Sequence, residues 1–359
     1  MSTPTRIAPE APARPAGPVR AQRRLPRFAP LGLFLAGVAL GFALSALSGF
    51  SIPTAVVYGV LLGTLAVYVA SRAVEGRRKA TDRLVTSLVT TAFGIAMVPL
   101  LSLVWTVLDN GLPRFDAAFF TNSMYRVVGE GGGAYHAILG TLVITALATA
   151  ISVPIGLMTA IYLVEYASGR LKKSITFFVD VMTGIPSIVA GLFAFALFTL
   201  LFGGGVRLGV MGAVALSVLM IPVVVRSCEE VLKLVPNELR EASYALGVPK
   251  WRTVVKVVLP TAIAGLGTGI TLAVARVVGE TAPLLVTVGL ITGTNLNPFD
   301  GRMATLPVFA FYQLTQPGTA TQAFLDRAWT AALVLIILVM ALNVVARLIS
   351  RFFAPKTGR

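Results

Sequence analysis

The chain has 359 residues, of which 56% are hydrophobic and 13% are charged, and its mean hydropathy is positive. This composition excludes a water-soluble globular protein and predicts a chain that crosses a bilayer several times. A single cysteine and a single histidine exclude an internal disulfide and a histidine–cysteine metal cluster, so we expect no metal and no cofactor.

The first 27 residues are rich in Pro, Ala and Arg and lack apolar periodicity, which predicts a disordered basic tail. The apolar stretch 28–50 is longer than the apolar core of a signal peptide, and we interpret it as a membrane span. The expected fold is an all-α integral membrane protein with about eight transmembrane helices. The other stretches of spanning length are 53–71, 84–108, 136–166, 174–203, 208–234, 255–290 and 328–349.

The placement of Lys and Arg predicts the orientation of these spans. If the N-terminus is cytoplasmic, most of the 30 basic residues fall on the inside, and the formal charge of +15 needs no nucleic-acid partner. Both termini are then cytoplasmic. The outer loops keep Arg114, Arg126, Arg207, Arg302 and Arg327.

Two outer connections are long, roughly 109–135 and 292–327, and they are rich in turn-forming residues. They are either solvated loops or the landing surface of an extracytoplasmic partner. His136 begins a span and is interpreted as a boundary residue. Glu165 lies near a cytoplasmic helix end, and Lys172 and Lys173 are its expected surface ion-pair partners.

A polar insert, 236–251, separates two spans on the cytoplasmic side. Pro236 suits a helix start, Asn237 can cap that helix, and Gly247 predicts its end before Pro249. A second helix is expected to run toward Val258. A connection between two spans needs only a few residues, so this longer insert is expected to bind a partner surface.

The composition of the first insert helix favours docking onto protein. Glu238, Glu241 and Ala245 lie on one side at spacings of three and four residues, and Ala242 adds a small contact surface. A helix lying on lipid headgroups would instead place Lys and Arg beside large apolar residues.

The stretch 255–290 carries two charges, Arg276 and Glu280. An ionisable group at membrane depth costs at least ~2.5 kcal/mol on insertion scales, so each is a functional candidate. Their spacing of four residues predicts one helix face. They form either a structural pair or a site in which Arg276 meets an anionic substrate and Glu280 holds the guanidinium in its absence. Thr268 offers a hydroxyl to the same face or bonds back to its own helix.

This stretch is also far longer than one crossing at ~1.5 Å per residue. Pro260 and Pro283 are each expected to remove a helix hydrogen bond, so we predict an elbow, a span and a broken end. Non-helical backbone at membrane depth fits a translocation path. Gly265 and Gly269 are spaced for close helix packing.

Glu241-Ala242-Ser243, Gly247 and Leu259-Pro260 at this spacing resemble the EAA loop of bacterial ABC importer permeases. Ser243 replaces the second Ala of that motif, and Val257 replaces the usual Ile. The resemblance implies a coupling helix, 238–250, that seats in a groove of a cytoplasmic ATPase. The residues assigned to ATPase coupling are Glu238, Glu241, Ala242 and Gly247.

The stretch from Ala275 to Pro283 resembles the signature of the PstA family of phosphate-importer permeases, and 160–167 and 184–193 agree with it. The resemblance covers roughly 84–352 and implies a six-span type I permease core. A two-helix hairpin with its basic loop, 28–83, precedes the core, and 353–359 form a cytoplasmic tail. The implied partners are phosphate, a homologous PstC permease, two copies of the PstB ATPase and an extracytoplasmic phosphate-binding protein, PstS. The implied substrate pathway consists of Arg276, Glu280, Thr281 and Thr268.

The sequence contains no Walker A loop, so we expect a transporter subunit of the plasma membrane rather than an enzyme, with ATP hydrolysed by a partner. Two alternatives remain. A permease for sulfate or molybdate would share the coupling loop but should lack the signature from Arg276 to Pro283. A membrane scaffold or sensor would explain the spans but needs neither the insert nor the intramembrane charges.

Overall fold

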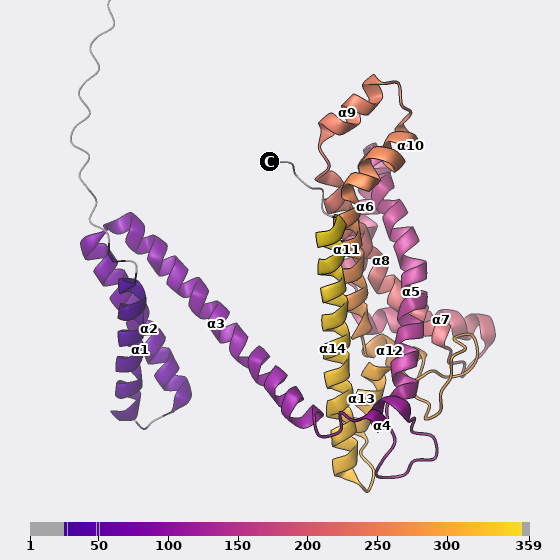
Figure 1. The fold of residues 1–359 in the computed structure, drawn as a ribbon, viewed down its shortest axis with the longest axis horizontal. Helices are drawn as coiled ribbons and strands as arrows, with labels where there is room; N and C mark the ends of the chain where they lie inside the picture. Colours follow the sequence, from indigo (N-terminus) through magenta and orange to yellow (C-terminus); the bar gives the residue numbers. More distant parts are fainter. Residues whose placement is uncertain (1–24, 27, 48, 50, 354–359) are drawn as a thin grey trace, which may run out of the picture. The chain divides into compact units, whose positions relative to one another are not determined.

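The computed structural model describes residues 25–26, 28–47, 49 and 51–353, and all regular structure in these residues is helical (Figure 1). Seven of the described helices are long and apolar enough to cross a membrane, and a bent helix pair raises the number to eight. The all-α, multi-pass prediction is therefore confirmed. The predicted tails, 1–27 and 353–359, lie mostly outside the described residues.

The chain divides into two compact units, Met1–Leu103 and Val104–Arg359. The first contains α1 (Ala29–Leu47), α2 (Ile52–Val74) and most of α3 (Arg77–Gly111). α1 and α2 pack along each other through glycines, because a Cβ on Gly37 would collide with the Gly63 backbone and a Cβ on Gly41 with that of Gly59. Small residues at these positions let the two helix backbones approach closely.

One carboxylate holds the turn between α2 and α3. The Glu75 side chain is 2% exposed and accepts hydrogen bonds from Arg83 Nε at 2.7 Å, Ser71 Oγ at 2.9 Å and the Leu25 N–H at 3.0 Å. The ion pair with Arg83, helped by the Leu25 and Ser71 donors, outweighs burial and lowers the pKa of Glu75 to about 2.

A folded-state pKa below the ordinary value of 4.5 means that this carboxylate stabilises the fold in full above pH 4.5 and that the contribution is lost as the pH falls toward 2. We therefore expect Glu75→Gln to lower the melting temperature of the detergent-solubilised protein at neutral pH. The difference from wild type should shrink as the pH is lowered. Scanning fluorimetry measures both effects, with Asp82→Asn, an exposed carboxylate nearby, as control. A difference that does not change with pH would contradict this assignment.

The second unit is a helix bundle in which α8 is central, since it packs against α5, α7 and α11. Figure 1 shows α9 and α10 at one end of this unit and α4 and α13 toward the other. Its helices are α4 (Ala117–Thr121), α5 (Tyr135–Ile161), a π-helical turn (Tyr162–Tyr166), α6 (Gly169–Thr183), α7 (Ser187–Phe202), α8 (Gly209–Lys233), α9 (Asn237–Ala245), α10 (Lys250–Thr253), a second π-helical turn (Val254–Val258), α11 (Leu259–Val278), α12 (Ala282–Thr287), α13 (Leu306–Thr315) and α14 (Thr321–Phe353).

Residues 174–203, expected as a single span, form parts of α6 and α7, whose axes are bent by 104° (Figure 1). The bend occurs at Gly184–Pro186. Pro186 lacks an N–H and disfavours helical conformation in the residue before it, so α6 ends at Thr183 and a new helix begins at Ser187.

The stretch 255–290 has the expected span and broken end, because the span is α11 and residues 279–281 separate α11 from α12. The segment predicted as an elbow corresponds to α10 and its π-helical turn, which run without a break into α11. Pro260 and Pro283 were expected to remove helix hydrogen bonds. Pro283 lies within the first two positions of α12, where proline is well tolerated because that N–H has no intrahelical partner. Pro260 lies where the π-helical turn passes directly into α11, so it is inside a continuous helical stretch.

The approach of α5 to the segment before α13 depends on Gly140. A Cβ at Gly140 would collide with the Ala304 carbonyl oxygen, and the next residue, Thr141, accepts a 2.8 Å hydrogen bond from the Leu306 N–H. We expect Gly140→Ala to destabilise the protein by about 1–3 kcal/mol through overpacking. Thermal unfolding in detergent measures this loss. Gly94→Ala is the control, because a Cβ there meets nothing within 4 Å, and equal melting of the two variants would contradict the prediction.

Candidate functional site

The two charges predicted to lie at membrane depth, Arg276 and Glu280, are at the end of α11. Arg276 is in the last turn of α11 and is exposed, and Gly279 occupies the C-cap position. Glu280 therefore lies outside the helix, so the expectation of a shared helix face is wrong. Within the described residues no hydrogen bond or ion pair joins Arg276 to Glu280.

Arg276 and Glu280 nevertheless border the same cavity, which has a volume of about 160 Å³. Two stretches that lie far apart in the sequence, 184–193 and 275–283, meet at this cavity, because the bend between α6 and α7 faces the end of α11. The other residues that line it are Met182, Thr183, Ile185, Ser187, Leu219, Val223 and Val277.

The polar groups of this cavity suit a small anion. Arg276 supplies a permanent positive charge with several N–H donors, and Ser187 supplies a hydroxyl. Ser187 is also the first residue of α7, a helix without a side-chain cap, so the free N–H groups of that helix begin at the cavity wall. The Thr183 hydroxyl is already used, since it donates to the Val179 carbonyl at 2.9 Å.

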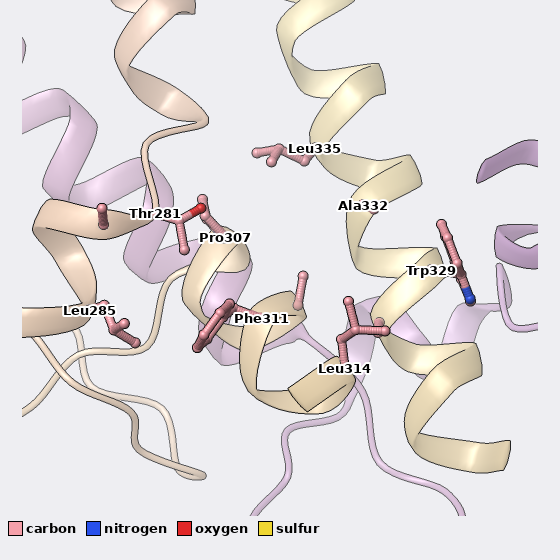
Figure 2. Close-up of a pocket in the computed structure, with 11 residues that line it drawn as sticks. Thr281, Leu285, Pro307, Phe311, Leu314, Trp329, Ala332 and Leu335 are labelled. Atoms are coloured by element: carbon pink, nitrogen blue, oxygen red, sulfur yellow. The ribbon is translucent and has the colours of Figure 1, made fainter. Parts of the chain in front are cut away.

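Thr281, the next residue along, lines a different space. It borders an apolar groove of about 450 Å³ between α12, α13 and α14, where Figure 2 shows it near Pro307, with Phe311 and Leu314 farther along. The break after α11 thus places Glu280 at the polar cavity and Thr281 at the groove. Since the groove is apolar, it offers little to hold an anion.

Arg207 fixes α12 beside this break. Its guanidinium donates to the carbonyl of Leu285, at 3.3 Å, and to that of Val286, and it lies 5.6 Å from the Phe195 ring centroid. The sequence had placed Arg207 only as a loop cation. In the structure it holds α12, whose residues Ala282 and Leu285 line the apolar groove.

Thr268 does not border the cavity of Arg276 and Glu280. Its hydroxyl donates to the Ala264 carbonyl at 2.8 Å, which is the local use that we considered for it. Gly265 and Gly269 pack closely against α8, since an added Cβ would contact Val231 and Ser227, respectively.

The polar insert, 236–251, has the predicted helix, glycine turn and second helix. Gly247 has a φ of +74°, its N–H donates to the Tyr244 carbonyl at 2.9 Å, and the Val248 N–H donates to the Ser243 carbonyl at 3.2 Å. These two bonds form a Schellman motif, which requires the left-handed conformation that glycine adopts most easily. Asn237 is not the cap, because it is the first helical residue and Pro236 precedes it without a side-chain bond.

The residues assigned to ATPase coupling are all at the surface. Glu238, Glu241, Ala242 and Gly247 are exposed, and Leu246 at the tip of the insert is 83% exposed. An exposed apolar side chain beside small residues and carboxylates is a suitable surface for docking onto another protein.

Two residues of this region were missed or misread from the sequence. Glu165 is not a surface partner of Lys172 and Lys173; it is buried and paired with Arg240, which follows it by 75 positions. The only sequence signal was the place of Arg240 beside Glu241 in the motif, and it did not identify a partner.

The opposite end of the unit is also more tightly built than expected. His136 is in the first turn of α5, as expected of a residue that begins a span, but it is 2% exposed and packs edge-on against Phe309. Arg327 is 1% exposed and donates to the carbonyls of Gly129 and Gly131, at 2.8 and 2.9 Å. The loop before α5 is therefore fastened to α14.

Residues 152–359 match the family model described as "Binding-protein-dependent transport system inner membrane component". The phosphate transport system permease protein PstA 1 of Mycobacterium tuberculosis is 48% identical over 286 residues, which cover 79% of this chain and 91% of that protein. PstA of Yersinia pestis is 37% identical over 284 residues, covering 78% and 92%.

A solved chain of a bacterial alginate ABC transporter matches with a TM-score of 0.55 and 12% identity, covering 78% of this chain and 97% of that one. This likeness concerns the fold alone. The match to the family model and the identity to curated relatives show that the chain belongs to the family of binding-protein-dependent transport system inner membrane components.

Proposed function

We propose that this chain is the transmembrane permease subunit of an ATP-driven importer of inorganic phosphate and forms half of its translocation pathway. The identity to PstA permeases over more than three quarters of the chain supports phosphate as the substrate. The observation that carries the proposal is the cavity at the end of α11. It combines Arg276, the Ser187 hydroxyl and the start of α7 beside non-helical backbone.

In this proposal Arg276 binds phosphate oxygens through its guanidinium, and Ser187 donates a further hydrogen bond. Glu280 borders the same cavity and repels an anion there, which keeps binding weak enough for release. Arg276 is exposed in this chain, and a single Arg is a poor match for a strongly hydrated dianion. We therefore infer that a homologous permease, PstC, completes the site at the interface between the two subunits.

The energy comes from a partner, because the sequence has no Walker A loop. We propose that two copies of the ATPase PstB bind the complex and that one docks on the exposed surface of α9. Closure of the ATPase would push the coupling segment, 238–250, and rock the helices between outward and inward openings. Of the assigned coupling residues, Glu241 is the docking carboxylate and Gly247 the turn.

The orientation in the plasma membrane follows from the basic segments. Both termini and α9 are cytoplasmic in this proposal, since Lys and Arg are concentrated on that side. The connections 109–135 and 292–327 are then extracytoplasmic and receive the phosphate-binding protein PstS. The description of the matched family as binding-protein-dependent supports such a partner.

A permease for sulfate or molybdate is the second candidate, because the donors of the cavity would accept any small oxyanion. The test is uptake of labelled phosphate by phosphate-starved cells that lack this chain, with and without its restoration. We expect uptake to be lost on deletion, to return with the wild-type chain and to resist competition by excess sulfate or molybdate. Unchanged uptake on deletion, or suppression by either competitor, would contradict a phosphate importer.

A further inference from the structure

The coupling helix is fastened to the membrane helices through one buried guanidinium. Arg240 lies in α9 beside the exposed Glu241, but its own side chain is only 12% exposed. Its Nη2 and Nε donate to Glu165 Oε1 at 2.8 and 3.1 Å, and the Glu165 side chain is 4% exposed. A charge pair held by two N–H donors and withdrawn from water has a fixed geometry, unlike a surface ion pair.

The same guanidinium also binds the end of α8. Nη2 donates to the Leu232 carbonyl at 3.0 Å and Nη1 to the Val235 carbonyl at 2.6 Å. The Leu232 carbonyl also accepts the Val235 N–H at 3.3 Å, so Arg240 adds a second donor, and a cation at a helix C-terminus is favoured by the helix dipole. Arg240 thus joins three elements: α9, the end of α8, and the π-helical turn after α5, which contains Glu165.

Two further contacts hold the coupling segment in the same place. The Ser243 and Thr253 hydroxyls share a buried 2.8 Å hydrogen bond that ties α9 to α10. The Lys250 ammonium lies 5.1 Å from the ring centroid of Tyr166, in the same π-helical turn as Glu165. π-helical turns are rare and occur often at functional sites, and the second one in this unit, Val254–Val258, directly follows α10.

α8 extends from this joint to the candidate substrate cavity. Leu232 at the joint and Val223 in the cavity wall lie in the same helix, nine residues or about 14 Å apart at 1.5 Å per residue. A displacement of α9 that keeps the bonds of Arg240 must therefore move the end of α8, and with it a wall of the cavity.

We propose that the Arg240–Glu165 pair is the joint that makes α9 move as one body with α8 and the end of α5. Arg240 is then a positioning residue, which transmits motion without touching substrate. This inference rests on the proposed function only in assigning α9 to ATPase docking. Without the joint, α9 still docks and the ATPase still turns over, but α9 is held only through α10, by the Ser243–Thr253 bond and the Lys250–Tyr166 contact, so its motion reaches α8 weakly and transport falls.

The functional test measures phosphate uptake and ATP hydrolysis by the full complex in proteoliposomes. Glu165→Gln removes the negative charge of the acceptor. Arg240→Lys keeps the positive charge but loses the planar guanidinium, whose N–H groups donate to Glu165 and to the carbonyls at the same time. We expect both to lower the phosphate transported per ATP at least about tenfold while hydrolysis persists. Glu230→Gln and Arg170→Lys, changes to exposed residues on the same side, should leave that ratio unchanged. If Glu165→Gln and Arg240→Lys transported as much phosphate per ATP as the wild type, the proposed role of the pair would be wrong.

A second measurement separates this inference from the proposed function. Spin labels on Leu246→Cys at the insert tip and Leu171→Cys at the start of α6, in a Cys228→Ser background, report the position of α9. We expect one narrow distance distribution in the otherwise unchanged chain and a broad one after Glu165→Gln, whatever the transported substrate is. Distance distributions of equal width in the two proteins would contradict the proposed role of the Arg240–Glu165 pair. Failure of the wild-type complex to take up phosphate would overturn only the proposed function.

Discussion

Replacing Arg276 with Gln is expected to lower phosphate uptake by at least about 100-fold while the complex still assembles. Hydrogen bonds to charged groups contribute roughly 1.5–3 kcal/mol each, and each 1.36 kcal/mol is a factor of ten. Arg276 supplies the positive charge among the residues that line the cavity, and Gln cannot replace it. The measurement is initial uptake of labelled phosphate by cells that carry the variant at wild-type abundance.

The exposure of Arg276 makes this a clean test of function. Within the described residues its side chain makes no ion pair, so its loss leaves no buried charge uncompensated. Arg276→Lys keeps the positive charge but lacks the planar guanidinium with its several N–H donors, so it should retain partial uptake. Arg347→Gln, an exposed change on α14, is the control. Normal uptake by Arg276→Gln would remove Arg276 from the pathway.

Replacing Glu241 with Lys should abolish transport by a different route. The change reverses the charge on the exposed face of α9 that is proposed to dock onto the ATPase, and like charges brought together at an interface cost several kcal/mol. We expect the complex still to form in lipid, because the rest of the interface is kept, and ATP hydrolysis to continue without phosphate uptake. Purified complexes in proteoliposomes allow both rates to be measured on one sample.

Glu230→Lys is the matched control for Glu241→Lys, because it makes the same charge change at an exposed position on α8 outside the coupling segment. It should leave the ratio of transport to hydrolysis unaltered. Transport by Glu241→Lys at the wild-type rate would show that this carboxylate has no part in coupling.

The elements that sequence reasoning predicted correctly depend on local information. Apolar length indicated the spans, and the turn chemistry of Gly247 indicated the two-helix insert, which the φ of +74° confirms. The broken end of 255–290 was also expected, because the stretch is far longer than one crossing and Pro283 is unfavourable inside a continuous helix.

The features that sequence reasoning missed depend on tertiary contacts or on the backbone conformation of a few residues at a helix end. Residues 174–203 are long enough for one span, so apolar length alone did not reveal the bend of 104°. The spacing of Arg276 and Glu280 was read as helical, but Gly279 ends α11 between them. The buried pair of Glu165 and Arg240 joins residues 75 positions apart, and no local pattern identifies such a partner.

The most direct test of the account is ATP-driven uptake of labelled phosphate by proteoliposomes that contain this chain with its permease partner, ATPase and binding protein. The wild-type complex should accumulate phosphate only with ATP, and the Arg276→Gln complex should hydrolyse ATP without accumulating phosphate. Equal accumulation by the two complexes would show that the cavity at the end of α11 is not the pathway. Absence of uptake by the wild-type complex, with sulfate or molybdate carried instead, would contradict phosphate as the substrate.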